Sequence, residues 1–273
     1  MANRLNNVPN SLGSATSPTI QTYSGEDLLA GLELVITLLA VFVAATVMGT
    51  VGFGFGLVAA PVILLFLEPQ SGVIVVNGVI TILTASVVVR TRQHLELKPV
   101  WLMCAGGAAA VPIGVFLLAN ADAGALRIAI GVIILVLGLI TLFNIQLPMV
   151  KSAATGGVVG FLTSLSITTL SIGGPLVAIY AVAQQWPPQK IRTTLAFYFV
   201  LSYLVGFVFY AWAGLLHRET LVNIGILIPA MVAGLALAGI LARRINQRVF
   251  RYAVAAVVIS GSVMLLSREL LLR

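Results

Sequence analysis

Charged residues are scarce in this chain. Asp, Glu, Lys and Arg together make up 8% of its 273 residues, whereas 60% are hydrophobic and the mean hydropathy is +1.10. A soluble domain of ordinary composition has about 25% charged residues. The composition therefore excludes a typical water-soluble domain and predicts an all-α integral membrane protein that crosses the bilayer several times.

Cysteine and histidine are almost absent. Cys104 is the single cysteine and lies in an apolar run, so the chain by itself builds neither a disulfide framework nor a cysteine metal site. His94 and His217 fall in loops that we expect on opposite sides of the membrane. No nucleophile and base pattern and no phosphate-binding loop is found in the sequence. We therefore expect no metal, no cofactor and no enzymatic activity.

The positive charge of the chain is arranged in short clusters. The formal net charge is +7, and the basic residues stand between long apolar runs. This arrangement is typical of the cytoplasmic loops of a membrane protein and not of a nucleic-acid groove. We expect lipid around the chain and no nucleic-acid partner.

Apolar runs divide the chain into a tail and two halves. Residues 1–27 are polar and rich in Asn, Ser and Thr, which predicts a mobile tail rather than a signal peptide. Residues 28–150 and 151–273 each contain five apolar runs. The runs are 28–50, 52–67, 71–89, 98–119, 124–143, 153–170, 173–185, 193–213, 219–242 and 249–267. Most reach the roughly 20 residues that a helix needs to cross a bilayer, but the second and seventh runs are short.

Each short run begins with a glycine-rich break. The breaks are Gly52-Phe53-Gly54-Phe55-Gly56 and Gly173-Gly174-Pro175, and both predict interrupted or re-entrant helices. Residues 54–70 align with residues 173–189 without a gap, and six aligned positions are identical. We therefore predict that the two halves are structural repeats.

The basic residues indicate how the repeats are related, because Lys and Arg gather in cytoplasmic loops. They follow the third run of the first half, but the second and fourth runs of the second half. The halves should therefore be inverted, with both termini outside the cytoplasm. The basic residues predicted to be cytoplasmic are Arg90, Arg92, Lys98, Lys151, Lys190, Arg192, Arg243, Arg244, Arg248 and Arg251.

The two breaks predict where a solute binds. Unwound backbone at membrane depth is costly unless it lines a cavity or is buried in protein. Helix N-termini that converge at such a cavity offer N–H donors and positive dipole ends, which favour a small anion. The predicted solute-binding residues are Gly52, Gly54, Gly56, Asn77, Ser164, Ser166, Thr168, Thr169, Ser171, Gly173, Gly174 and Pro175.

The polar side chains of this set have two interpretations. The hydroxyls between residues 163 and 171 could ligate the oxygens of an anion, or they could bond to helix carbonyls and pack helices together. Asn77 could contact a ligand or form a hydrogen bond between helices. No apolar run carries a convincing Asp, Glu, Lys or Arg in its interior, so no carboxylate relay for protons is evident. Protons remain a candidate coupling ion.

Four sequence features together resemble a known family. They are Gly56-Leu57-Val58-Ala59-Ala60-Pro61, the pattern Gly160-x-x-x-Ser164, the Gly173-Gly174-Pro175 break and the basic turn Lys190-Ile191-Arg192. In this combination the chain resembles the sulfite exporter TauE/SafE family from about residue 30 to residue 267. It departs from the family pattern where Phe53 and Phe55 separate the glycines of the first break, and at Val75-Val76-Asn77.

The resemblance implies a secondary transporter, or permease, of the bacterial inner membrane. The expected solutes are sulfur-containing anions such as sulfite, sulfoacetate or other organosulfonates, often moved outward by alternating access. Two alternatives stay open from the sequence: a passive anion channel, and a membrane scaffold that transports nothing. The oligomeric state does not follow from the sequence.

Overall fold

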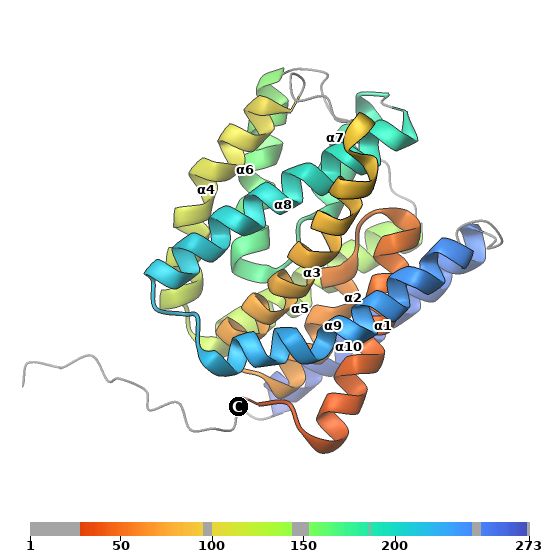
Figure 1. Cartoon of the computed structure of the whole chain (residues 1–273). Coiled ribbons are helices and arrows are strands. Elements are labelled where there is room, and N and C mark those ends of the chain that lie inside the picture. The colour runs from red at the N-terminus through yellow and green to blue at the C-terminus, as the bar shows by residue number, and fades with distance from the viewer. Residues whose placement is uncertain (1–27, 95–99, 144–152, 186, 242–246, 272–273) are drawn as a thin grey trace, which may run out of the picture.

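The computed structural model describes residues 28–94, 100–143, 153–185, 187–241 and 247–271. Within these ranges every regular element is a helix (Figure 1). The first half contains α1 (Gly31–Val51), α2 (Phe55–Phe66), α3 (Pro69–Thr91), the short 3-10 helix η2 (Arg92–His94), α4 (Trp101–Asn120) and α5 (Ala123–Phe143). The second half contains α6 (Ala153–Leu170), α7 (Gly174–Ala183), α8 (Pro188–Trp212), α9 (Arg218–Leu241) and α10 (Gln247–Leu271).

Each of the ten predicted apolar runs corresponds to one of these α-helices, which confirms the all-α fold class. The largest differences are at α8, which begins at Pro188 instead of residue 193, and at α10, which extends to Leu271. Proline suits the first turn of a helix, because its missing N–H would have no intrahelical partner there. The predicted tail 1–27, and Lys98, Lys151, Arg243 and Arg244, lie outside the described residues.

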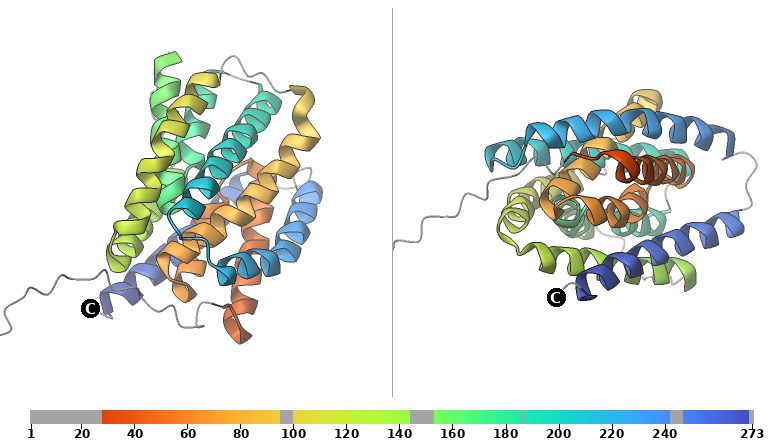
Figure 2. Two further views of the ribbon diagram at one scale, coloured as in Figure 1. Left: turned by 60° about the vertical axis from the view of Figure 1, so that its left-hand side comes forward. Right: turned by 90° about the horizontal axis from the view of Figure 1, so that it is seen from below.

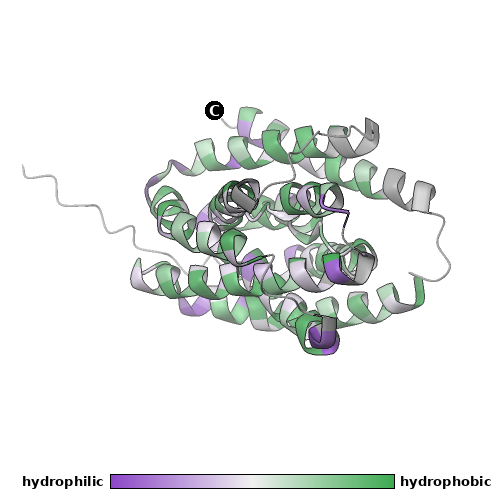
Figure 3. Cartoon of the chain, turned by 90° about the horizontal axis from the view of Figure 1, so that it is seen from above, coloured by the Kyte–Doolittle hydropathy of each residue, from purple (hydrophilic) through white to green (hydrophobic). Residues whose placement is uncertain are grey.

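Six of the described helices are long and apolar enough to cross a membrane. Their most apolar 18-residue windows have mean hydropathies from 1.7 to 2.5. The helices are rich in hydrophobic residues along their lengths (Figure 3), and large apolar side chains such as Leu32, Phe116 and Val208 are exposed. Lipid accommodates apolar side chains as the protein interior does, so these side chains need not be buried within the bundle. The chain is a multi-pass membrane protein.

The helices of the two halves interleave in one bundle. α1 packs along α9, and α4 packs along α6 (Figures 1 and 2). α3 packs on α8 between these pairs, and α5 packs on α10. If the two halves are repeats, α1 corresponds to α6 and α4 corresponds to α9. The pair of α1 with α9 is then equivalent to the pair of α6 with α4, so the packing has the symmetry that two repeats would produce. The division into repeats 28–150 and 151–273 stays a prediction.

Small residues allow the pairs to approach closely. In the pair of α4 with α6, a Cβ atom on Gly160 would collide with the Met103 carbonyl, and one on Gly106 would collide with the Gly157 carbonyl. In the pair of α1 with α9, Gly234 lies in the same way against the Phe42 carbonyl. Backbone contact of this kind is how helices associate in lipid, where no hydrophobic effect drives them together.

The short helices α2 and α7 do not cross the membrane by themselves. With 12 and 10 residues, they are about 18 and 15 Å long at about 1.5 Å per residue, against a hydrocarbon core of about 30 Å. α2 turns back against α1, and α7 turns back against α6. Each short helix therefore forms a hairpin with the long helix before it, with the glycine-rich break at the tip.

An ion-pair cluster holds the far end of the first hairpin. The Arg127 guanidinium lies 3.7 Å from a Glu68 carboxylate oxygen and 3.6 Å from a Glu269 carboxylate oxygen. Glu68 follows α2, Arg127 belongs to α5, and Glu269 is near the end of α10. The cluster thus joins three elements at the end of the bundle where α3 and α5 begin and α10 ends.

Candidate functional site

The first break is built from glycines in the left-handed region. Gly52 caps the C-terminus of α1; it has a φ of +98° and donates its N–H to the Met48 carbonyl at 2.7 Å. Gly54 has a φ of +101° and precedes the first residue of α2. Only glycine adopts such angles without a Cβ penalty, so both positions need glycine for the chain to reverse within three residues.

The second break has the same helix cap, with serine instead of glycine. Ser171 has a φ of +60°, its N–H donates to the Ile167 carbonyl at 2.9 Å, and the next N–H, of Ile172, donates to the Ser166 carbonyl at 3.3 Å. The Ser171 hydroxyl donates to the Val73 carbonyl of α3 at 3.0 Å. With Gly54 aligned to Gly173, Ser171 falls opposite Gly52, so the two caps occupy corresponding places in the halves.

The tips of the two hairpins touch each other. A Cβ atom on Gly56 would collide with the Ser171 carbonyl, and a Cβ atom on Gly174 would lie 2.8 Å from Cβ of Phe53. These contacts join segments that are more than a hundred residues apart in the sequence. The structure therefore brings the two predicted breaks together in the interior of the bundle.

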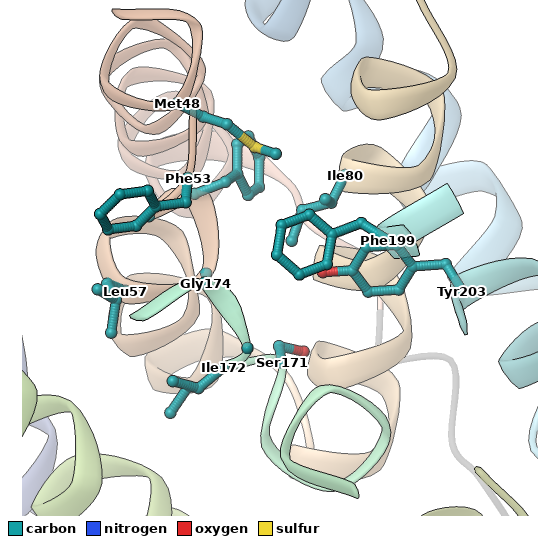
Figure 4. Close-up of a pocket in the computed structure, with 13 residues that line it drawn as sticks. Met48, Phe53, Leu57, Ile80, Ser171, Ile172, Gly174, Phe199 and Tyr203 are labelled. Carbon is teal, nitrogen blue, oxygen red and sulfur yellow. The ribbon is translucent and has the colours of Figure 1, made fainter. Parts of the chain in front are cut away.

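A small cavity lies between the tips (Figure 4). Phe53 and Leu57 lie on one side of it, Phe199 and Tyr203 lie on the other, and Ser171 is below. Its volume of about 20 Å³ has room for about one water molecule. The lining residues are Met48, Phe53, Gly54, Phe55, Gly56, Leu57, Ile80, Ser171, Ile172, Gly173, Gly174, Phe199 and Tyr203. None of these residues carries a charge.

Two helices begin at this cavity. The first intrahelical hydrogen bond of α2 is donated by the Val58 N–H to the Gly54 carbonyl at 3.3 Å. The N–H groups of residues 55–57 lie before this bond and therefore have no acceptor within the helix. No side chain of the described residues caps this helix end. α7 begins at Gly174, which also lines the cavity. The uncapped N–H groups and the positive dipole ends make this an environment for a negative charge.

Tyr203 adds a side-chain donor to these backbone groups. It is buried in α8, and its hydroxyl points into the cavity in Figure 4. No hydrogen bond joins this hydroxyl to another residue in the part of the chain that the structure describes. Because its hydroxyl faces the cavity, Tyr203 is suited to donate a hydrogen bond to an occupant of the cavity.

The predicted hydroxyl residues are not all at the cavity. The Ser164 hydroxyl lies 2.6 Å from the Tyr198 hydroxyl and 2.9 Å from that of Ser202. Thr168 donates within α6 to the Ser164 carbonyl at 2.8 Å, and Thr169 donates to the Gly114 carbonyl of α4 at 3.2 Å. These three side chains bond to protein groups, and their roles in solute binding stay predictions.

The other predicted residues divide between the cavity and its surroundings. Gly54, Gly56, Ser171, Gly173 and Gly174 line the cavity. Gly52 lines a larger neighbouring cavity, while Ser166 and Pro175 are half-buried beside the second break and outside the cavity lining. The roles of these residues in solute binding stay predictions.

Asn77 connects three helices. Its side-chain N–H groups donate to the Ile167 carbonyl of α6 at 3.0 Å and to the Tyr210 hydroxyl of α8 at 3.1 Å. Tyr210 in turn donates to the Thr168 carbonyl at 2.6 Å. This network holds α3 and α8 on the last turn of α6, directly before the second break.

The sequence did not point to several lining residues. Phe199 and Ile80 come from α8 and α3, and Met48 comes from the last turn of α1. They are ordinary apolar residues in apolar runs, so nothing in their local sequence distinguishes them. The phenylalanines at positions 53 and 55 did carry a signal, since they interrupt the glycines of the first break.

The fold and this site define a polytopic membrane transport protein for small solutes. Its membrane-spanning helices surround a central cavity at the tips of two hairpins, a location where transporters bind their solutes. The family model described as "Sulfite exporter TauE/SafE" matches residues 37–265. The chain belongs to the sulfite exporter TauE/SafE family, which confirms the resemblance predicted from the breaks. No curated protein and no solved structure gave a significant match.

Proposed function

We propose that the protein is a secondary transporter of small sulfur-containing anions, such as sulfite, sulfoacetate or other organosulfonates. Family membership supports a transporter of sulfite-type anions. The observation that supports anion binding in this chain is the cavity at which α2 and α7 begin, lined by uncapped N–H groups and no acidic side chain. Such a site replaces the hydration of an anion without holding it by a fixed cation.

The proposed mechanism is alternating access between the two hairpins. The cavity holds about one water molecule, so a sulfite ion requires the hairpin tips to separate or the side chain of Phe53 to move. Two inverted repeats, residues 28–150 and 151–273, would allow the same cavity to open first to one side and then to the other. The bacterial inner membrane, both termini outside and outward transport belong to this proposal.

The test is solute flux with purified protein in liposomes. Radiolabelled sulfite and a two-carbon sulfonate are offered with and without a pH gradient. We expect saturable flux and counterflow, because a carrier binds and releases one solute at a time, and a response to the gradient would identify protons as the coupling ion. Linear flux without counterflow would indicate a channel, and no flux of any small anion would leave the scaffold interpretation.

Tyr203→Phe should weaken the binding of the anion while the fold is kept. A hydrogen bond to a charged group is worth about 1.5–3 kcal/mol, so the apparent Km for sulfite should rise about tenfold or more. The thermal stability should not fall, because the hydroxyl has no partner in the described part of the chain. The measurements are flux against sulfite concentration and a melting curve in detergent.

Tyr198→Phe is the matched control in the same helix. The Tyr198 hydroxyl donates to the Gly160 carbonyl at 2.6 Å and does not line the cavity. Its loss should lower the melting temperature and leave the apparent Km close to that of the native protein. If Tyr203→Phe behaved like Tyr198→Phe, the hydroxyl of Tyr203 would have no role in solute binding.

A further inference from the structure

A second and larger cavity lies beside the hairpin tips. It has a volume of about 170 Å³ and is bounded by α1, α3, α8 and α9. Its lining includes Met48, Gly52, Thr84, Arg90, Ala196 and Gly239. This volume is more than eight times that of the cavity between the breaks (170 against 20 Å³), so it accommodates a small anion together with water.

The two cavities share a wall. Met48 lines both, and Gly52 of the larger cavity is separated by one residue from Gly54 of the smaller one. The unbranched methionine side chain rotates about three bonds, so it can change position without moving the backbone. Rotation of Met48 would join the cavities into one path that leads to the N-terminus of α2.

The larger cavity is at the positively charged end of the bundle. Arg90, in the last turn of α3, is exposed and is the charged residue of the cavity lining. The acidic side chains in the described ranges lie at the other end, near the starts of α1, α3, α5 and α9 and the end of α10. They are Glu33, Glu68, Asp122, Glu219 and Glu269. An anion in water is therefore drawn toward the mouth of this cavity.

We propose that this cavity is the vestibule through which the anion passes between the cytoplasm and the break cavity. Arg90 collects the anion at its mouth, and Met48 separates the vestibule from the solute site. The inference rests on the proposed transport function, and it adds the access route, its side of the membrane and the residue that selects charge.

Single cysteines test this route without relying on transport. In a Cys104→Ala background, which removes the one native cysteine, Thr84→Cys and Ala196→Cys place thiols on the vestibule wall. Thr84 and Ala196 are both buried, so neither thiol would be exposed on the outer surface. Val232→Cys, in the middle of α9 and exposed on the apolar outer surface, is the matched control.

The probes are two membrane-impermeant methanethiosulfonates, one with a sulfonate group and one with a trimethylammonium group. Each transfers its sulfenyl sulfur to the thiolate and releases methanesulfinate, and each rate is divided by that with free cysteine. From the face that carries Arg90, we expect both vestibule thiols to react and the anionic reagent to be favoured about tenfold. A two-carbon sulfonate, which does not itself attack the reagents, should slow the reaction, and Val232→Cys should not react.

Arg90→Gln and Arg92→Gln separate the proposed role from a general surface charge. Both arginines are exposed near the end of α3, but Arg92 does not line the cavity. Arg90→Gln should remove the preference for the anionic reagent, whereas Arg92→Gln should keep most of it. High salt should reduce the preference in the parent protein.

Three results would overturn the inference. They are vestibule thiols no more reactive than Val232→Cys, reaction only from the opposite face, and equal effects of the two arginine variants. Because thiol modification does not depend on flux, a protein that transports neither sulfite nor a sulfonate could still show the vestibule. Normal saturable flux with unreactive vestibule thiols would instead leave the proposed function standing and remove this route.

Discussion

Liposomes that contain the Gly174→Leu variant should transport sulfite no faster than liposomes without protein. The Cβ atom alone would lie 2.8 Å from Cβ of Phe53, which is closer than side-chain carbons approach one another. The remaining carbons of leucine would then occupy a cavity that holds about one water molecule. Both the contact between the hairpin tips and the space for the anion would be lost.

The matched control is Gly225→Leu in α9. Gly225 is exposed, and a Cβ atom there would meet nothing within 4 Å, so the added side chain faces lipid. This variant should transport sulfite at the native rate. Both variants should insert in the membrane and elute as single species in detergent. Native flux by a correctly folded Gly174→Leu variant would remove the second break from the transport mechanism.

The helices could be predicted from the sequence because a bilayer permits few backbone arrangements. An apolar run inside a bilayer must satisfy its backbone groups internally, which in a single segment requires a helix. For this reason even the short runs after the breaks, at residues 52–67 and 173–185, matched α2 and α7. The start of α8 was predicted too late, because apolarity alone does not reveal that a helix continues through Lys190 and Arg192.

The site could be predicted only where the backbone itself is unusual. Gly54 and Gly174 stand out because glycines at a break mark a chain reversal, and both line the cavity. Phe199 and Tyr203 line it because α8 packs across the hairpin tips, and nothing local in the sequence encodes a contact between distant segments. Ser164 and Thr168 are one turn apart in α6, and their hydroxyls bond within the protein rather than at the break.

Gly160→Ala should destabilise the protein strongly although it adds a single methyl group. The new Cβ atom would collide with the Met103 carbonyl, which belongs to the backbone of α4 and cannot turn away as a side chain can. The two helices would have to separate along their length. The expected cost is about 3 kcal/mol, the upper end of the usual range for overpacked cores, although alanine is by itself the better helix former.

Cys104 provides the measurement, because this single cysteine lies in α4 next to Met103 and is partly buried. A thiol-reactive fluorophore in detergent would report the temperature at which α4 becomes accessible, and that temperature should fall clearly in Gly160→Ala. Gly157→Ala, nearly one turn earlier in α6, is the control, since its Cβ atom would lie 3.6 Å from the nearest atom, the Leu102 carbonyl oxygen. Its melting temperature should be unchanged or higher. Equal melting temperatures for the two variants would show that α4 and α6 are not held together by this backbone contact.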